Sequence, residues 1–145
     1  MSVPANKREL SHIQFLFELY QFNVKLAEIC ENSPKKYRAN YADHIIKTGL
    51  KALQLAQYGN SIYLSKATTE DAFNEREMSF KKAESLVDNI ATTSQIYLEL
   101  VRKCGVPNEK IAKRQEYIGT KANEIISLLQ GVQKSDRERY KKYKS

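Results

Sequence analysis

Apolar residues recur along this chain at alternating spacings of three and four, the pattern of helices that bury one side. Residues 7–31 carry two such seams. The first seam is Leu10, Ile13, Phe17, Tyr20, Val24 and Ala27. The second seam is Phe15, Leu19, Phe22, Leu26 and Ile29. Two seams let one helix be covered from two sides. The second seam is therefore expected either to be buried between neighbouring helices or to touch another subunit, and Phe15, Leu19, Phe22 and Leu26 are the candidate oligomer contact.

Breaks in the pattern predict four helices. Asn32-Ser33-Pro34 separates the first helix from a second one that ends near residue 64, and polar residues 65–69 precede a third over 70–104. A heptad seam runs through the third helix. Its members are Phe73, Phe80, Val87, Ser94 and Val101, with Ala83, Ile90, Tyr97 and Cys104 three residues later. Arg76 occupies an expected apolar place, so part of 70–80 is alternatively a loop. Gly105 and Pro107 stop this helix before a fourth one.

Short connections between long helices make sequential neighbours antiparallel. We therefore expect an all-α, up-down-up-down four-helix bundle over residues 1–131, which is one domain. Gly131 is predicted to end the last helix. The mostly charged residues 132–145 are predicted to be a flexible basic C-terminal tail. No apolar stretch is long enough to span a membrane and no secretory core precedes the first helix, so we expect a cytoplasmic protein without membrane contact.

Positive charge is unevenly distributed along the chain, whose net charge is +7. Residues 34–66 hold six Lys and Arg against Asp43 alone, and residues 132–145 hold six against Asp136 and Glu138. A basic surface attracts polyanions, of which nucleic acid is the commonest in cytoplasm. The alternative is ordinary charge that keeps a helical surface hydrated.

The second predicted helix carries a stripe of polar side chains at helical spacing, called here the basic ridge. It consists of Lys36, Asn40, His44, Lys47, Lys51, Gln54 and Tyr58. The ridge contains no carboxylate, and Lys35 and Arg38 lie beside it. Such a stripe can follow a phosphate backbone but has no base-reading motif, so we expect binding that is insensitive to sequence and sensitive to salt. A solvated helix face is the alternative.

The predicted tail interleaves tyrosines with cations, a composition that can stack on unpaired bases while it holds phosphate. A disordered solubilising end is the alternative. Together these segments supply nine nucleic-acid-binding candidates. They are Lys35, Lys36, Arg38, Lys47, Lys51, Arg137, Arg139, Lys141 and Lys142.

Catalytic and metal-binding residues are missing from the pattern. His12 and His44 lie on different helices and no nucleophile–base pair is evident, so we predict that the protein is not an enzyme. Glu9 and His12 form one Glu-x-x-His, but a di-metal bundle needs two. No metal site and no cofactor are expected. Cys30 and Cys104 are expected to be buried, reduced thiols, with a redox role as the alternative.

Two stretches resemble a known family. They are Pro34-Lys35-Lys36-Tyr37-Arg38, and Gln115-Glu116-Tyr117 followed by Glu124-Ile125-Ile126-Ser127-Leu128-Leu129-Gln130-Gly131. The chain resembles the four-helix proteins encoded in ribosomal-RNA intervening sequences and their relative, the accessory variability determinant of diversity-generating retroelements. It departs from the latter at Ile126 and Val132, where Gly and Trp are usual. The resemblance implies a pentamer with a basic exterior that binds RNA and DNA, and partnership with a reverse transcriptase. The resemblance aligns Lys35, Lys36 and Arg38 with basic positions of the family, and it implies no catalytic residue.

The leading hypothesis is thus a non-enzymatic, homo-oligomeric bundle that binds nucleic acid, RNA or DNA or both, and assists a retroelement reverse transcriptase. The rival from another class is a structural or adaptor bundle that binds protein helices, with its charge serving solubility only.

Overall fold

The computed structural model describes residues 13–145, and they form an all-α fold of four helices, as the sequence predicts. The first is α1 (Gln14–Cys30). The second is a continuous helix made of α2 (Lys35–Tyr37), the π-helical turn η3 (Arg38–Ala42) and α3 (Asp43–Ser61). The third and fourth are α4 (Glu70–Arg102) and α5 (Asn108–Lys144). The alternative of a loop within 70–80 is wrong, because this stretch is helical throughout. The start of the first seam at Leu10, and Glu9 with His12, lie outside the described residues.

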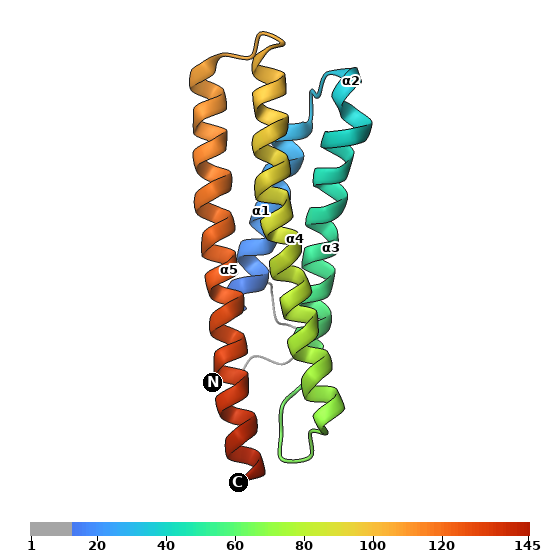
Figure 1. Cartoon of the computed structure of the whole chain (residues 1–145), viewed down its shortest axis with the longest axis vertical. Helices are drawn as coiled ribbons and strands as arrows, with labels where there is room; N and C mark the ends of the chain where they lie inside the picture. The colour runs from blue at the N-terminus through green and yellow to red at the C-terminus, as the bar shows by residue number, and fades with distance from the viewer. Residues whose placement is uncertain (1–12) are drawn as a thin grey trace.

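The helices are arranged around one elongated core. In Figure 1 the chain reverses direction at each connection, α4 lies between α3 and α5, and α1 lies behind α4. Both α3 and α5 contact α4 on one side and α1 on the other. With 33 and 37 residues, α4 and α5 span about 50 and 55 Å, whereas α1, with 17 residues, covers about 25 Å. At one end of the molecule, therefore, α3, α4 and α5 extend beyond the first turn of α1.

The two seams of α1 have opposite environments. Phe15, Leu19, Phe22 and Leu26, named above as the candidate oligomer contact, are between 0 and 7% exposed in the core of a single chain. They are therefore not available to a second subunit. The first seam is the outward one, since Tyr20 and Val24 are 47% and 44% exposed. Both seams are equally apolar, so the sequence alone does not tell which one faces the neighbouring helices.

Local signals place most helix ends. Thr69 caps α4 through its Oγ1, which accepts a hydrogen bond from the backbone N–H of Ala72 at 3.1 Å. Gly105 follows the end of α4 with φ of +95°, the left-handed conformation that suits a helix stop. At the start of α5, Asn108 is the first helical residue and directly follows Pro107.

The helix end expected at Gly131 is wrong. Helix α5 continues to Lys144, so residues 132–144 extend the bundle instead of forming a separate segment. Gly131 is not among the residues with positive φ in the described chain, so it does not adopt the conformation of a helix stop. Beyond it, Gln133 and Asp136 are each 3% exposed. Those two side chains are polar, and an apolar periodicity therefore misses this last packed stretch.

Candidate nucleic-acid interface

The basic ridge lies on the outer surface of α3. Lys47 and Lys51, one helical turn apart, are exposed, and within the described chain no carboxylate oxygen comes within 4.0 Å of either amine. Two neighbouring ammonium groups repel each other unless solvent or an anion lies between them. These two lysines therefore offer uncompensated positive charge to a polyanion.

The π-turn η3 interrupts the ridge. It lies between Lys36 and His44, and a π-turn holds about one residue more than an α-turn. This extra residue rotates Lys36 by about a quarter turn from the line that α-helical spacing predicts. Lys35, Lys36 and Arg38 thus belong to the end of the bundle and not to the α3 stripe. The spacing of the residues in the sequence does not predict this separation of Lys36 from the α3 stripe.

Other members of the ridge tie α3 to α4. The ring nitrogen Nε2 of His44 lies 3.1 Å from Oδ1 of Asn89, and the Tyr58 hydroxyl donates a hydrogen bond to the Glu75 carboxylate. The bond to Glu75 raises the pKa of Tyr58, so the phenol stays protonated. These side chains fix the register of the two helices. They are less free than Lys47 and Lys51 to contact a ligand.

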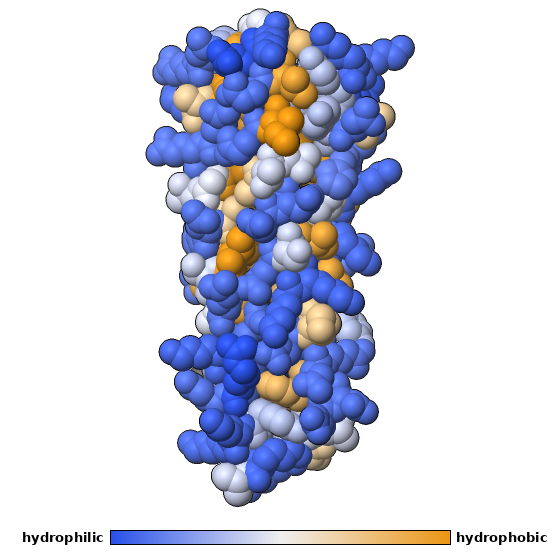
Figure 2. All heavy atoms as spheres, viewed as in Figure 1, coloured by the Kyte–Doolittle hydropathy of each residue, from blue (hydrophilic) through white to orange (hydrophobic). Residues whose placement is uncertain are grey.

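The alignment of α3 with α4 adds to the basic face a residue that is not among the predicted binding residues. The contacts His44–Asn89 and Tyr58–Glu75 place Lys51 midway along an antiparallel pair, at the level of Lys82 on α4. Lys82 is exposed and, in residues 13–145, has no carboxylate within 4.0 Å. The sequence does indicate that Lys82 is exposed, because it falls outside the α4 heptad seam. Figure 2 views the molecule with α4 in front, and hydrophilic side chains cover most of that face, with smaller apolar patches among them.

The cations that precede α3 are also exposed. Lys35, Lys36 and Arg38 have no carboxylate partner in the described range. The Arg38 guanidinium donates to the Ser33 carbonyl at 3.4 Å, and the Lys36 ammonium lies 5.1 Å from the centre of the Tyr37 ring. Both contacts leave the positive charge uncancelled. This group forms a second basic surface at the bundle end where α1 meets α2.

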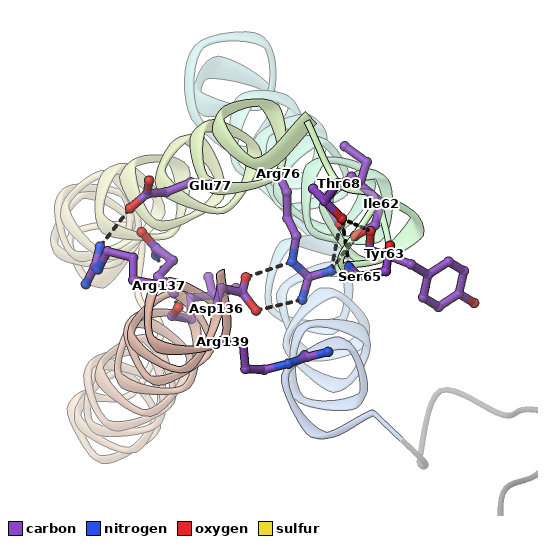
Figure 3. Close-up of polar contacts among 12 residues, drawn as sticks. Ile62, Tyr63, Ser65, Thr68, Arg76, Glu77, Asp136, Arg137 and Arg139 are labelled. Atoms are coloured by element: carbon purple, nitrogen blue, oxygen red, sulfur yellow. Dashed lines mark hydrogen bonds and ion pairs between the residues drawn. The ribbon is translucent and has the colours of Figure 1, made fainter. Parts of the chain in front are cut away.

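The third basic region, residues 132–144 of α5, is held by a buried ion pair (Figure 3). The Arg76 guanidinium donates to both carboxylate oxygens of Asp136, at 2.7 and 3.1 Å. It also donates to the carbonyls of Gly59 and Ile62, at 3.1 and 2.9 Å, and lies over the Phe80 ring. Arg76 therefore joins α4, the end of α3 and the last part of α5. The same arginine was the residue out of pattern in the heptad seam.

One predicted binding residue of this region, Arg137, and the neighbouring Tyr140 serve packing. Arg137 pairs with Glu77 at 2.7 Å, and Arg139 lies 3.5 Å from the Tyr143 hydroxyl. The Tyr140 ring stacks on Phe73 with centroids 4.3 Å apart. The Lys144 ammonium lies 5.4 Å from the centre of the Tyr140 ring. With Phe73 against it, Tyr140 is not a free platform for a base.

Of the four predicted binding residues on this stretch, Arg139, Lys141 and Lys142 keep free charges. All three are exposed and have no carboxylate within 4.0 Å in the part of the chain that the structure describes. A region that the composition suggests is uniformly basic therefore contains one neutralised cation, Arg137, beside free ones.

Residues 13–145 hold no group of three or more His, Cys, Asp or Glu that could bind a metal ion. Cys30 is buried as expected, which raises the pKa of its thiol to about 11. The expected burial of Cys104 is wrong, because α4 ends at Arg102 and Cys104 is exposed beyond it. His44 contacts only Asn89 and Thr48 through its ring. None of the described helices has the length and apolarity needed to cross a bilayer.

No family model, curated protein or solved structure matches this chain. The resemblance described above therefore remains a prediction.

Proposed function

We propose that this protein is a non-enzymatic nucleic-acid-binding bundle that contacts the phosphate backbone with the face formed by α3 and α4. The observation that carries this proposal is that Lys47, Lys51 and Lys82 lie on one face without carboxylate partners in the described chain. The surface offers charge but no group arranged to read base edges. Binding is therefore expected to RNA and DNA alike, with little dependence on sequence and a steep dependence on salt.

The test is a titration of fluorescent RNA and DNA duplexes of two unrelated sequences at several salt concentrations. Replacing Lys47 and Lys51 with Glu should weaken binding of all of them alike, by about tenfold or more at low salt. The matched control replaces Lys25 and Lys113 with Glu. It makes the same change in net charge at lysines that already pair with Glu28 and Glu109. Absence of binding at low salt, or equal losses in both variants, would contradict the proposal.

Self-association is a further part of the proposed function, now through a different surface. Tyr20 and Val24 of α1 and Leu50 of α3 are each more than 40% exposed. The Asn23 side chain donates to the Gly49 carbonyl at 3.0 Å, so Val24 and Leu50, one residue further along each helix, flank the same contact line. This apolar surface supports a homo-oligomer, and the resemblance suggests a pentamer. Val24→Glu with Leu50→Glu should reduce the mass measured by sedimentation velocity.

The same apolar surface favours the second candidate function, an adaptor that binds protein helices. The two candidates differ in sedimentation with and without nucleic acid. A monomer that ignores polyanions and retains a protein partner would favour the adaptor. A reverse transcriptase as that partner, and a cytoplasmic location, are suggested by the sequence alone. Co-purification with the product of a neighbouring reverse-transcriptase gene tests the former.

A further inference from the structure

A small cavity lies at the end of the bundle where α1 and α4 end and α5 begins. Its volume is about 110 Å³. Ile29, Tyr97 and Val101 form an apolar floor, and Asn32, Lys110 and Arg114 lie around it. In Figure 1 this end is the one opposite the C-terminus. The cavity is separate from the α3–α4 face, and its lining contains none of the nine predicted nucleic-acid-binding residues.

Arg114 is the residue that gives this cavity chemical character. It is partly buried, and in residues 13–145 no carboxylate lies within 4.0 Å of its guanidinium. Its positive charge acts against the rise that burial causes in the pKa of the Cys30 thiol. The buried Arg76, by comparison, is paired with Asp136. Arg114 is less buried than Arg76 and has no such anion in the described chain.

Lys110 adds a second cation, one helical turn before Arg114 on the same side of α5. Most acids at this end already have partners. Glu99 pairs with Arg102, Glu109 pairs with Lys113, and Glu28, at the cavity rim, lies 3.8 Å from the Lys25 ammonium with a side chain that is 61% exposed. The cavity therefore combines two cations and an amide, and its one acid is directed largely to solvent.

We propose that this cavity binds a single phosphate group, with Arg114 and Lys110 neutralising its charge and the Asn32 amide donating a hydrogen bond. A guanidinium fork fits two oxygens of a tetrahedral oxyanion. The cavity is small, about 110 Å³, so a single phosphate group is the proposed occupant. The group is thus either the terminal phosphate of a strand, whose sugar and base stay outside, or free phosphate. This site does not depend on the function proposed for the α3–α4 face.

The first experiment is thermal unfolding with inorganic phosphate against sodium chloride at equal ionic strength. Phosphate should raise the melting temperature of the wild-type protein, and Arg114→Gln should weaken phosphate binding by about tenfold. Arg102→Gln is the matched control, since Arg102 is at the same end but pairs with Glu99. Lys110→Gln, at an exposed position, should weaken binding by several-fold and serves if Arg114→Gln does not fold. Equal responses to both salts, or the same loss in Arg102→Gln, would overturn the proposal.

The second experiment assigns the source of the phosphate. Oligonucleotides of one sequence with a 5′-phosphate, a 3′-phosphate or neither are compared in wild-type protein and in Arg114→Gln. Tighter binding of one phosphorylated end, lost in Arg114→Gln, identifies a strand terminus. Equal binding of all three, with the phosphate-dependent melting shift retained, identifies free phosphate. Lys47→Glu with Lys51→Glu should leave that melting shift unchanged, so failure of the α3–α4 proposal and failure of this one give different results.

Discussion

Two regions of similar composition use their positive charge in different ways. On α3, Lys47 and Lys51 point to solvent and have no acid beside them in the described chain. At the end of α5, Arg137 pairs with Glu77, and Asp136 receives two hydrogen bonds from the buried Arg76. The first arrangement leaves charge available to a ligand. The second uses ion pairs to hold one helix against another.

The difference shows that the local density of cations does not measure the charge that a surface presents. The stretch around α3 contains one acid of its own, and within the described chain neither Lys47 nor Lys51 has a carboxylate of another helix within 4.0 Å. The end of α5 meets acids and an arginine of α4 that lie 60 residues earlier in sequence. Only the packing of α4 against α5 reveals those pairs. Substitutions of the paired charges should therefore change mainly stability, and substitutions of the free charges should change mainly nucleic-acid binding.

The largest expected effect is on folding. Asp136→Ala leaves the Arg76 guanidinium buried without its anion, so the free energy of unfolding should fall by about 3–5 kcal/mol in urea denaturation. The control is Arg137→Ala, which breaks the more exposed pair with Glu77 and should cost no more than about 1 kcal/mol. Similar small losses in both variants would show that the end of α5 is not anchored by the buried pair.

A smaller effect is expected from the aromatic stack. Tyr140→Ala removes the ring that lies on Phe73, at a cost of about 1–2 kcal/mol. Because that contact is near the end of α5, amide hydrogen exchange should accelerate mainly in residues 133–144. Tyr143→Ala, whose ring has no stacked partner in the described chain, is the control. Unchanged exchange in Tyr140→Ala would mean that the stack does not hold the helix end.

On α3 the expected effect is on binding and not on stability. Lys47→Gln with Lys51→Gln should lower affinity for nucleic acid by about tenfold and reduce the slope of log K against log salt by about 0.7–0.9 per lysine. The free energy of unfolding should stay within about 0.5 kcal/mol of wild type, since both side chains are exposed. Arg137→Gln should change the slope less, because its charge is already paired with Glu77. An equal change in slope would remove the contrast between the two regions.

Sequence periodicity predicts what is local and apolar in this fold. The heptad positions Phe73, Phe80, Val87, Ser94 and Val101 are all buried, because a repeated apolar spacing on a long helix defines its inner side. It does not reveal the π-turn, whose extra residue has no signature in side-chain type. It leaves open whether the second seam of α1 is buried between helices or meets a subunit, and it wrongly ends α5 at Gly131, since both outcomes depend on which helices pack together. The exposed lysines Lys47 and Lys51 could be predicted from their spacing on one helix. Lys82 and the cavity at Arg114 could not, because their positions depend on how neighbouring helices align.

The smallest expected effect distinguishes the two descriptions of α5 most directly. Gly131 lies inside a continuous helix, and a Cβ added there would meet no atom within 4 Å. Gly131→Ala should therefore stabilise the protein by about 0.5–1 kcal/mol, because alanine loses less backbone freedom on folding. If α5 ended at Gly131 in a left-handed conformation, the same change would destabilise by about 1 kcal/mol or more. Gly105→Ala supplies the comparison within the same protein, since Gly105 has φ of +95° and should lose stability. Urea denaturation gives opposite signs for the two glycines if residues 132–144 continue the helix, and the same sign if they do not.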